Sequence, residues 1–160
     1  MAKRVWFTKE KFKLLVDDQV VEFTALGGNL FFGFVFVIMF LSGFVDVARV
    51  LFISIILFTG ISLGIKYYFS RTRPNKVSLK HASVFEKMND ASFPSIHSGR
   101  AIILGYVVGP ILPGYAKWFF YVAMIGIPIS RIILKKHFWS DVIAGALIGF
   151  LVAYGVNLLI

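Results

Sequence analysis

Two histidines, each close to a serine and to a long apolar stretch, are the residues with the clearest chemical potential. His97 lies in the segment Ser92–Gly99, directly before an apolar stretch, and His137 lies four residues before Asp141. A carboxylate at that spacing can hold one imidazole N–H, which leaves the other ring nitrogen free to act as a nucleophile. The structural alternative for Asp141 is that its charge opens the last helix, because negative charge is favourable at a helix N-terminus.

Three basic residues near the ends of apolar stretches could bind an anion. Lys66 and Arg73 are seven residues apart, so both can project from one side of a helix that Pro74 helps to end. Arg131 lies inside the far end of an apolar stretch, where a guanidinium is unfavourable unless it has an anionic partner, either Asp141 or a bound phosphate. Taken singly, such residues are more often anchors that extend to the membrane surface. The anion-binding interpretation therefore depends on their combination with the histidines.

The composition of the chain is that of a membrane protein. Of its 160 residues, 58% are hydrophobic, and the mean hydropathy is +0.81, far above the roughly half-apolar average of soluble domains. We therefore expect an all-α, polytopic membrane helical bundle of about five transmembrane helices, folded as a single domain over residues 1–160. The expected spans are Ala25–Val45, Val50–Ile65, Ala101–Ala116, Trp118–Leu134 and Val142–Ile160.

The segments outside these spans differ strongly in charge. Asp46–Arg49 predicts a short turn between the first two spans, and Lys66–Arg100 predicts an extramembrane loop. Trp6–Val16 combines aromatic and aliphatic residues with lysines, which predicts an interfacial amphipathic helix; a basic tail is the alternative. Five spans place this segment, the loop and Arg131–Asp141 on one face of the membrane, together with 15 of the 17 Lys and Arg residues.

This charge asymmetry has two interpretations. The positive-inside rule would place the basic face in the cytoplasm. The same face can also gather anionic lipid headgroups, so that its charge serves substrate binding. Under the second interpretation, the expected partners are the membrane and an anionic lipid phosphate substrate, with no nucleic acid. The sequence does not predict the oligomeric state.

Three segments together resemble the signature of the type 2 phosphatidic-acid phosphatase superfamily. Lys-x6-Arg-Pro corresponds to Lys66–Pro74, Pro-Ser-x-His to Pro94–His97, and Ser-Arg-x5-His-x3-Asp to Ser130–Asp141. All three spacings match in order, and the resemblance extends from about Asp17 to the C-terminus. Two features depart from the family: Ile96 stands where most members have glycine, and most membrane members have six spans.

The resemblance implies how a phosphate would be bound. Lys66, Arg73 and Arg131 would bind the phosphate oxygens, and Ser95 and the backbone amide of Ile96 would add neutral donors.

The resemblance also implies the chemistry of a lipid phosphatase. His137 would attack phosphorus in line, Asp141 would fix its tautomer, and His97 would protonate the leaving lipid oxygen as a general acid. Water would then hydrolyse the phosphohistidine. Fixed cations can supply the charge stabilisation that magnesium gives in kinases, and the sequence holds no acidic cluster suited to a divalent metal. We therefore expect no metal and no cofactor, and the absence of cysteine excludes thiolate ligands and cysteine nucleophiles.

The motifs recognise a phosphate but do not identify the lipid that carries it. The resemblance to small bacterial members and the basic face favour lipid A 1-phosphate, with undecaprenyl diphosphate and phosphatidylglycerol phosphate as alternatives. A lipid phosphotransferase, in which an alcohol replaces water, is a further alternative. An anion channel or transporter is disfavoured, because Ala25–Val45 and Val142–Ile160 carry no charged residue at mid-membrane depth.

The resemblance also predicts where the protein resides. It implies a multi-pass protein of the bacterial inner membrane, with the active site on the extracytoplasmic face. This expectation conflicts with the positive-inside rule, which would place the same basic face in the cytoplasm.

Overall fold

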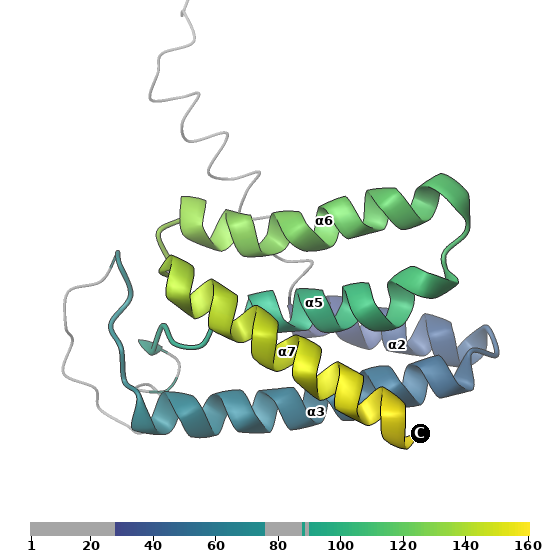
Figure 1. The fold of residues 1–160 in the computed structure, drawn as a ribbon, viewed down its shortest axis with the longest axis horizontal. Coiled ribbons are helices and arrows are strands. Elements are labelled where there is room, and N and C mark those ends of the chain that lie inside the picture. Colours follow the sequence, from purple (N-terminus) through teal and green to yellow (C-terminus); the bar gives the residue numbers. More distant parts are fainter. Residues whose placement is uncertain (1–27, 76–87, 89) are drawn as a thin grey trace, which may run out of the picture.

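A computed structural model describes residues 28–75, 88 and 90–160. The predicted interfacial helix Trp6–Val16 lies outside these residues. The described part of the chain is helical (Figure 1), which confirms the expected all-α membrane fold for this part. Its elements are α2 (Asn29–Leu41), α3 (Val45–Tyr68), α5 (Ile96–Val108), the 3-10 helix η1 (Gly109–Ile111), α6 (Gly114–Ile133) and α7 (Trp139–Leu159).

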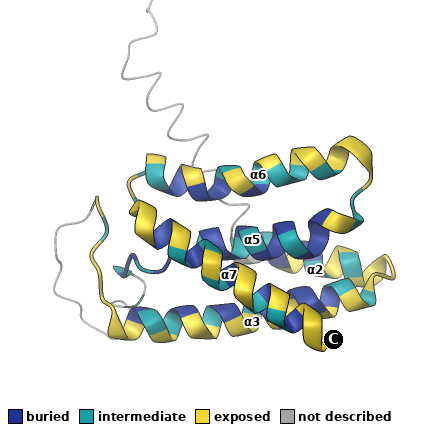
Figure 2. Ribbon diagram, in the orientation of Figure 1, coloured by how far each residue is buried: buried dark blue, intermediate teal, exposed yellow. Residues whose placement is uncertain are grey.

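Three of these helices, α3, α6 and α7, are long and apolar enough to cross a membrane. Two shorter apolar segments, Leu30–Leu41 and Ile96–Ile111, correspond to α2 and to α5 with η1. The outer faces of the helices are exposed (Figure 2). Many of the exposed residues are large and apolar; on α6, for example, Phe119 is 80% exposed. Apolar residues all round a helix are expected where its outer face contacts lipid.

Two of the predicted boundaries are wrong. Asp46 and Arg49 do not form a turn, because they lie in the first turn of α3, where the Arg49 guanidinium donates to the Asp46 carboxylate at 3.2 Å. The chain turns just before them, at Gly43, whose φ is +82°. The third helix begins earlier than expected, at Ile96, inside the predicted loop. It ends at Val108 and continues as η1, which contains Pro110, a residue without the N–H that an α-helix needs.

Helix α5 is the central element of the bundle. Helices α3, α6 and α7 all pack against it, whereas α2 packs mainly on α3. In Figure 1, α5 lies between α3 and α6, and α7 crosses it. The fully buried side chains include Leu51 and Phe58 of α3, Ile103 and Leu104 of α5, and Ile127 of α6.

Glycines bring α5 and α7 into backbone contact at the end of the bundle that carries the predicted site residues. A Cβ atom on Gly149 would overlap the backbone of Gly99, and one on Gly145 would overlap the carbonyl of Ser95. The Ser95 N–H also donates to the carbonyl of Asp141 at 2.9 Å. The N-termini of α5 and α7 are therefore held together, beside the C-termini of α3 and α6 (left in Figure 1).

Candidate active site

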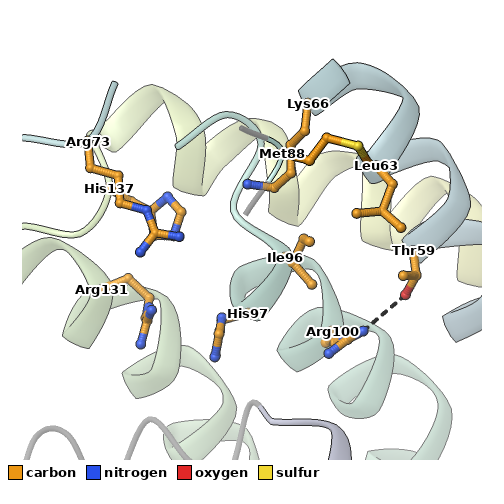
Figure 3. A pocket seen from close by; sticks show the side chains of 10 residues that line it. All are labelled: Thr59, Leu63, Lys66, Arg73, Met88, Ile96, His97, Arg100, Arg131 and His137. Carbon is orange, nitrogen blue, oxygen red and sulfur yellow. Dashed lines mark hydrogen bonds between the residues drawn. The ribbon is translucent and has the colours of Figure 1, made fainter. Parts of the chain in front are cut away.

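The ends of α3, α5 and α6 and nearby connecting segments line a cavity of about 280 Å³ (Figure 3). Its walls come from α3, α5 and α6, from the segment after α3 and from the segment between α6 and α7. Six of the eight predicted site residues line it, and the other two, Ser95 and Asp141, are fully buried. The lining residues are Thr59, Leu63, Lys66, Arg73, Met88, Ile96, His97, Arg100, Arg131 and His137.

His137 is held as a neutral imidazole with one ring nitrogen bonded to the backbone. Its Nδ1 lies 2.7 Å from the carbonyl oxygen of Ser92, and because a carbonyl can only accept, Nδ1 carries the hydrogen. The unprotonated nitrogen is then Nε2. Burial lowers the pKa of His137 to about 3, and the charges of Arg131 and Lys66 act in the same direction. The ring is therefore neutral at physiological pH, the state that a nucleophilic histidine requires.

The end of α6 determines where His137 lies. Lys135 has a positive φ of 52°, which turns the chain back on itself just after the helix. The N–H groups of Lys136 and His137 both donate to the carbonyl of Arg131, at 3.1 and 3.3 Å. His137 is thus tied to the last turn of α6, and the Arg131 side chain of that turn faces the same cavity.

Asp141 has a different partner from the one that the sequence predicted. Its carboxylate lies 3.8 Å from Nδ1 of His137, beyond hydrogen-bond distance, and the carbonyl of Ser92 accepts that bond instead. The two carboxylate oxygens accept from the N–H of Phe138 and from Arg71, each at 2.9 Å. Asp141 instead takes the structural role that the sequence also allowed. It lies in the first turn of α7, where negative charge is favourable.

Arg71 is the main site residue that sequence reasoning missed. Its guanidinium donates to Asp141 and to the Ser140 hydroxyl, the latter at 2.7 Å, and lies 4.0 Å from the centroid of the Phe138 ring. Its backbone carbonyl accepts the N–H of Ser92 at 2.8 Å. Arg71 therefore joins the start of α7 to the segment whose carbonyl holds His137. The sequence signal was a third basic residue between Lys66 and Arg73.

The predicted phosphate-binding cations are largely removed from solvent. Lys66 is 3% exposed and Arg131 is 5% exposed. The Lys66 ammonium donates to the carbonyl of Ala91, and the buried Nε of Arg131 has no hydrogen-bond partner among the described residues. Burial lowers the pKa of the Arg73 guanidinium, and the charge of Asp90 partly offsets this. None of the described lining residues is acidic, so the cavity favours an anion.

The N-terminus of α5 contributes the remaining predicted residues. Ser95 precedes the first helical residue, and its Oγ accepts a hydrogen bond from the hydroxyl of Ser98 at 2.8 Å. Ile96 and His97 open the helix, and the side chains of both line the cavity. The first N–H groups of a helix have no partner within it, which makes this end of α5 suited to an anion.

A buried cationic cavity at one end of a bundle of apolar helices can bind an anionic group near the membrane surface. The family profile of the PAP2 superfamily matches residues 47–160, and the chain belongs to this superfamily. It is a membrane lipid phosphatase. Membership decides between the enzyme and transport alternatives in favour of the enzyme.

Two solved structures share the fold. LpxE from Aquifex aeolicus superposes with a TM-score of 0.74 at 22% identity, over 98% of this chain and 99% of LpxE. A transmembrane PAP2-type phosphatidylglycerolphosphate phosphatase from Bacillus subtilis superposes with a TM-score of 0.70 at 24% identity, over 91% of this chain and 76% of that chain. A comparison with curated protein sequences found no match. Both neighbours are bacterial proteins. The helices long and apolar enough to cross a membrane support a membrane protein.

Replacement of Arg71 by Gln should destabilise the fold, because Asp141 then remains buried without its cationic partner. Asp141 is fully buried whereas Arg71 is 43% exposed, so we expect a coupling of about 1–3 kcal/mol, below the range for a fully buried pair. The coupling free energy is measured by a double-mutant cycle of Arg71→Gln and Asp141→Asn, in which the free energy of unfolding of each protein is determined in detergent.

The Arg49–Asp46 pair provides the matched control. Its side chains are 62% and 86% exposed, so the same cycle there should give less than about 1 kcal/mol. A coupling at Arg71–Asp141 no larger than that of the exposed pair would contradict the structural role assigned to Arg71.

Proposed function

We propose that this protein hydrolyses a lipid phosphate monoester or diphosphate through a phosphohistidine intermediate on His137, without a metal ion. The observation that carries the proposal is the imidazole of His137, hydrogen-bonded through Nδ1 to the carbonyl of Ser92 in a cavity lined by buried cations. This arrangement leaves the lone pair on Nε2 of His137 available to attack phosphorus. The buried cations attract the phosphate group to it.

In the first step, Nε2 of His137 attacks phosphorus in line with the bond to the lipid oxygen. The N–P bond forms as the P–O bond breaks, and the protonated form of His97 donates its proton to the leaving lipid oxygen. The carbonyl of Ser92 stabilises the positive charge that develops on the ring, because it accepts the hydrogen on Nδ1. Lys66, Arg73 and Arg131 stabilise the charge on the equatorial oxygens.

In the second step, water attacks phosphorus from the side that the lipid has left. His97, now neutral, accepts a proton from this water, and the N–P bond breaks to release inorganic phosphate and return His137 to its starting state. A lipid phosphotransferase would differ only in this step, where an alcohol would replace water.

The metal-free part of the proposal rests on the side chains of the site. Lys66, Arg73 and Arg131 line the cavity, and they can supply the charge stabilisation that magnesium gives in kinases. In the described segments, no three His, Asp or Glu side chains lie close enough together to hold a metal ion.

For the lipid, lipid A 1-phosphate is our first candidate, with undecaprenyl diphosphate and phosphatidylglycerol phosphate as the alternatives. The fold match to LpxE, which is nearly complete over both chains, supports the first candidate. The match to the phosphatidylglycerolphosphate phosphatase covers 76% of that chain, which is a less complete correspondence.

Phosphate release by the detergent-purified protein, in excess chelator and from each of the three lipids, tests this proposal. The wild-type protein should release phosphate, and His137→Ala should reduce the rate by on the order of 10³-fold or more, because the nucleophile is lost. Lys117→Ala, at the opposite end of the bundle, is the control and should retain the wild-type rate. Release that chelator abolishes, or that survives in His137→Ala, would contradict the mechanism.

We also propose that the protein lies in the inner membrane with its cavity on the extracytoplasmic face. Because the chain has no cysteine, a single cysteine introduced in place of Lys80 or Lys117 can be labelled without background from native thiols. The two positions are expected on opposite faces of the membrane. On intact cells, a membrane-impermeant thiol reagent should label Lys80→Cys but not Lys117→Cys. The reverse pattern would place the cavity in the cytoplasm, as the positive-inside rule predicts.

A further inference from the structure

Lys136 is a cation beside the proposed nucleophile that the mechanism above does not use. It directly precedes His137, and its N–H donates to the carbonyl of Arg131 at 3.1 Å. Both of these residues line the cavity, whereas Lys136 is not part of the cavity wall. Lys136 is partly buried and is more exposed than Arg131. It therefore lies at the edge of the cavity, between the buried cations and the surface.

The charge of Lys136 acts on the catalytic end of the cavity. In Figure 3, the two histidines gather toward one end of the cavity with Arg73 and Arg131. Lys136 interacts electrostatically with Arg131 and Arg73 and with His97. Burial lowers the pKa of the Lys136 ammonium, and the charges of Arg131 and Arg73 act in the same direction. Like charges held together are unfavourable, so this arrangement favours an anion among them.

The described part of the chain supplies no such anion. None of the described residues forms a hydrogen bond or an ion pair with the Lys136 ammonium. The nearest carboxylate after it in the sequence, that of Asp141, is fully buried and accepts from Arg71 and from the N–H of Phe138. The anion that suits the position of Lys136 is therefore a bound one.

We propose that Lys136 binds an anionic group of the leaving lipid and so selects lipid phosphates that carry a second phosphate next to the scissile one. The inference rests on the proposed function and specifies its substrate class. In that function, the scissile phosphate has three cations of its own, and His97 lies beside the leaving oxygen. The interaction between Lys136 and His97 places the Lys136 ammonium near that oxygen. The adjacent phosphate of a diphosphate, or the phosphodiester of a glycerol phosphate headgroup, lies just beyond it.

The chemistry of a lysine suits this role. Its ammonium is a compact charge with three donors on a flexible stem, so it can follow a phosphate group at more than one spacing from the scissile phosphorus. A phosphate monoester on an otherwise neutral lipid, such as phosphatidic acid, has no group for Lys136 to bind. Such a lipid is predicted to be the poorer substrate.

Three lipids with the same acyl chains test the subsite: phosphatidic acid, diacylglycerol diphosphate and phosphatidylglycerol phosphate. Each is presented in the same detergent micelles with excess chelator, and kcat/KM is measured for the wild type, Lys136→Gln and Lys135→Gln. The quantity compared is the preference, which is kcat/KM for a two-phosphate lipid divided by kcat/KM for phosphatidic acid. An effect of Lys136 on His97 changes all three values alike, so it cancels in this ratio.

Lys136→Gln should reduce the preference by about 10-fold. This is the lower end of the range for a lost hydrogen bond to a charged group, because solvent screens a partly exposed lysine. Lys135→Gln is the matched control and should leave the preference unchanged. Lys135 is an exposed lysine of the same turn, and glutamine keeps a long polar side chain at its positive φ.

The pattern of loss decides the outcome. A loss on only one of the two-phosphate lipids supports the subsite and identifies the spacing that it accepts. An equal loss on all three lipids assigns Lys136 to the scissile phosphate and overturns the subsite, as does an unchanged preference in Lys136→Gln. Lys136→Arg keeps the charge and should retain part of the preference, which separates loss of binding from loss of fold.

A binding measurement separates this inference from the proposed function. Titration calorimetry in detergent compares methylenediphosphonate, whose P–C–P bridge resists hydrolysis, with inorganic phosphate. The wild type and Lys135→Gln should bind the diphosphonate more tightly, and Lys136→Gln should lose most of that difference. If the wild type hydrolyses no lipid phosphate, the proposed function fails. Equal affinity of the wild type for the two ions, or a difference that Lys136→Gln retains in full, overturns the subsite by itself.

Discussion

The hydrogen bond from Nδ1 of His137 to the carbonyl of Ser92 is the interaction on which the rest of the site depends. It selects the tautomer whose Nε2 is unprotonated, and because a carbonyl does not titrate, the selection does not change with pH. Ser92 is itself fixed by bonds from its N–H to the carbonyl of Arg71 and from its hydroxyl to the carbonyl of Thr72. His137 is therefore held in position by the segment after α3 as well as by the segment between α6 and α7.

Helix packing brings the cations into the same cavity as His137. The backbone contact at Gly145 and Gly149 fixes the start of α5 against α7, and the central position of α5 places α3 and α6 around it. Lys66 and Arg131 are buried as a result, an unfavourable environment for a charge. In the proposed function, a bound phosphate would compensate for that burial, and the low dielectric would strengthen its attraction to the cations.

Sequence reasoning located the helices and the motif residues, but not the contacts that orient them. The apolar stretches marked the helices α2, α3, α5, α6 and α7 of the described residues. The turn predicted at Asp46–Arg49 was wrong, because charged residues near a membrane surface can also lie at the start of a helix. Arg71 was missed because its partner Asp141 lies 70 residues away, a pairing that local spacing cannot indicate. The role of Ser92 is carried by a backbone carbonyl, which every residue type possesses.

The most direct test of this account is the ¹⁵N NMR spectrum of the histidine-labelled protein in detergent micelles. The signals of His137 are assigned by their loss in His137→Gln. The account predicts a neutral ring with a hydrogen on Nδ1 and none on Nε2, unchanged as the pH falls from about 8 to about 5, because its pKa is lowered to about 3. A ring that titrates near its ordinary pKa of about 6.5, or that carries its hydrogen on Nε2 at neutral pH, would contradict it.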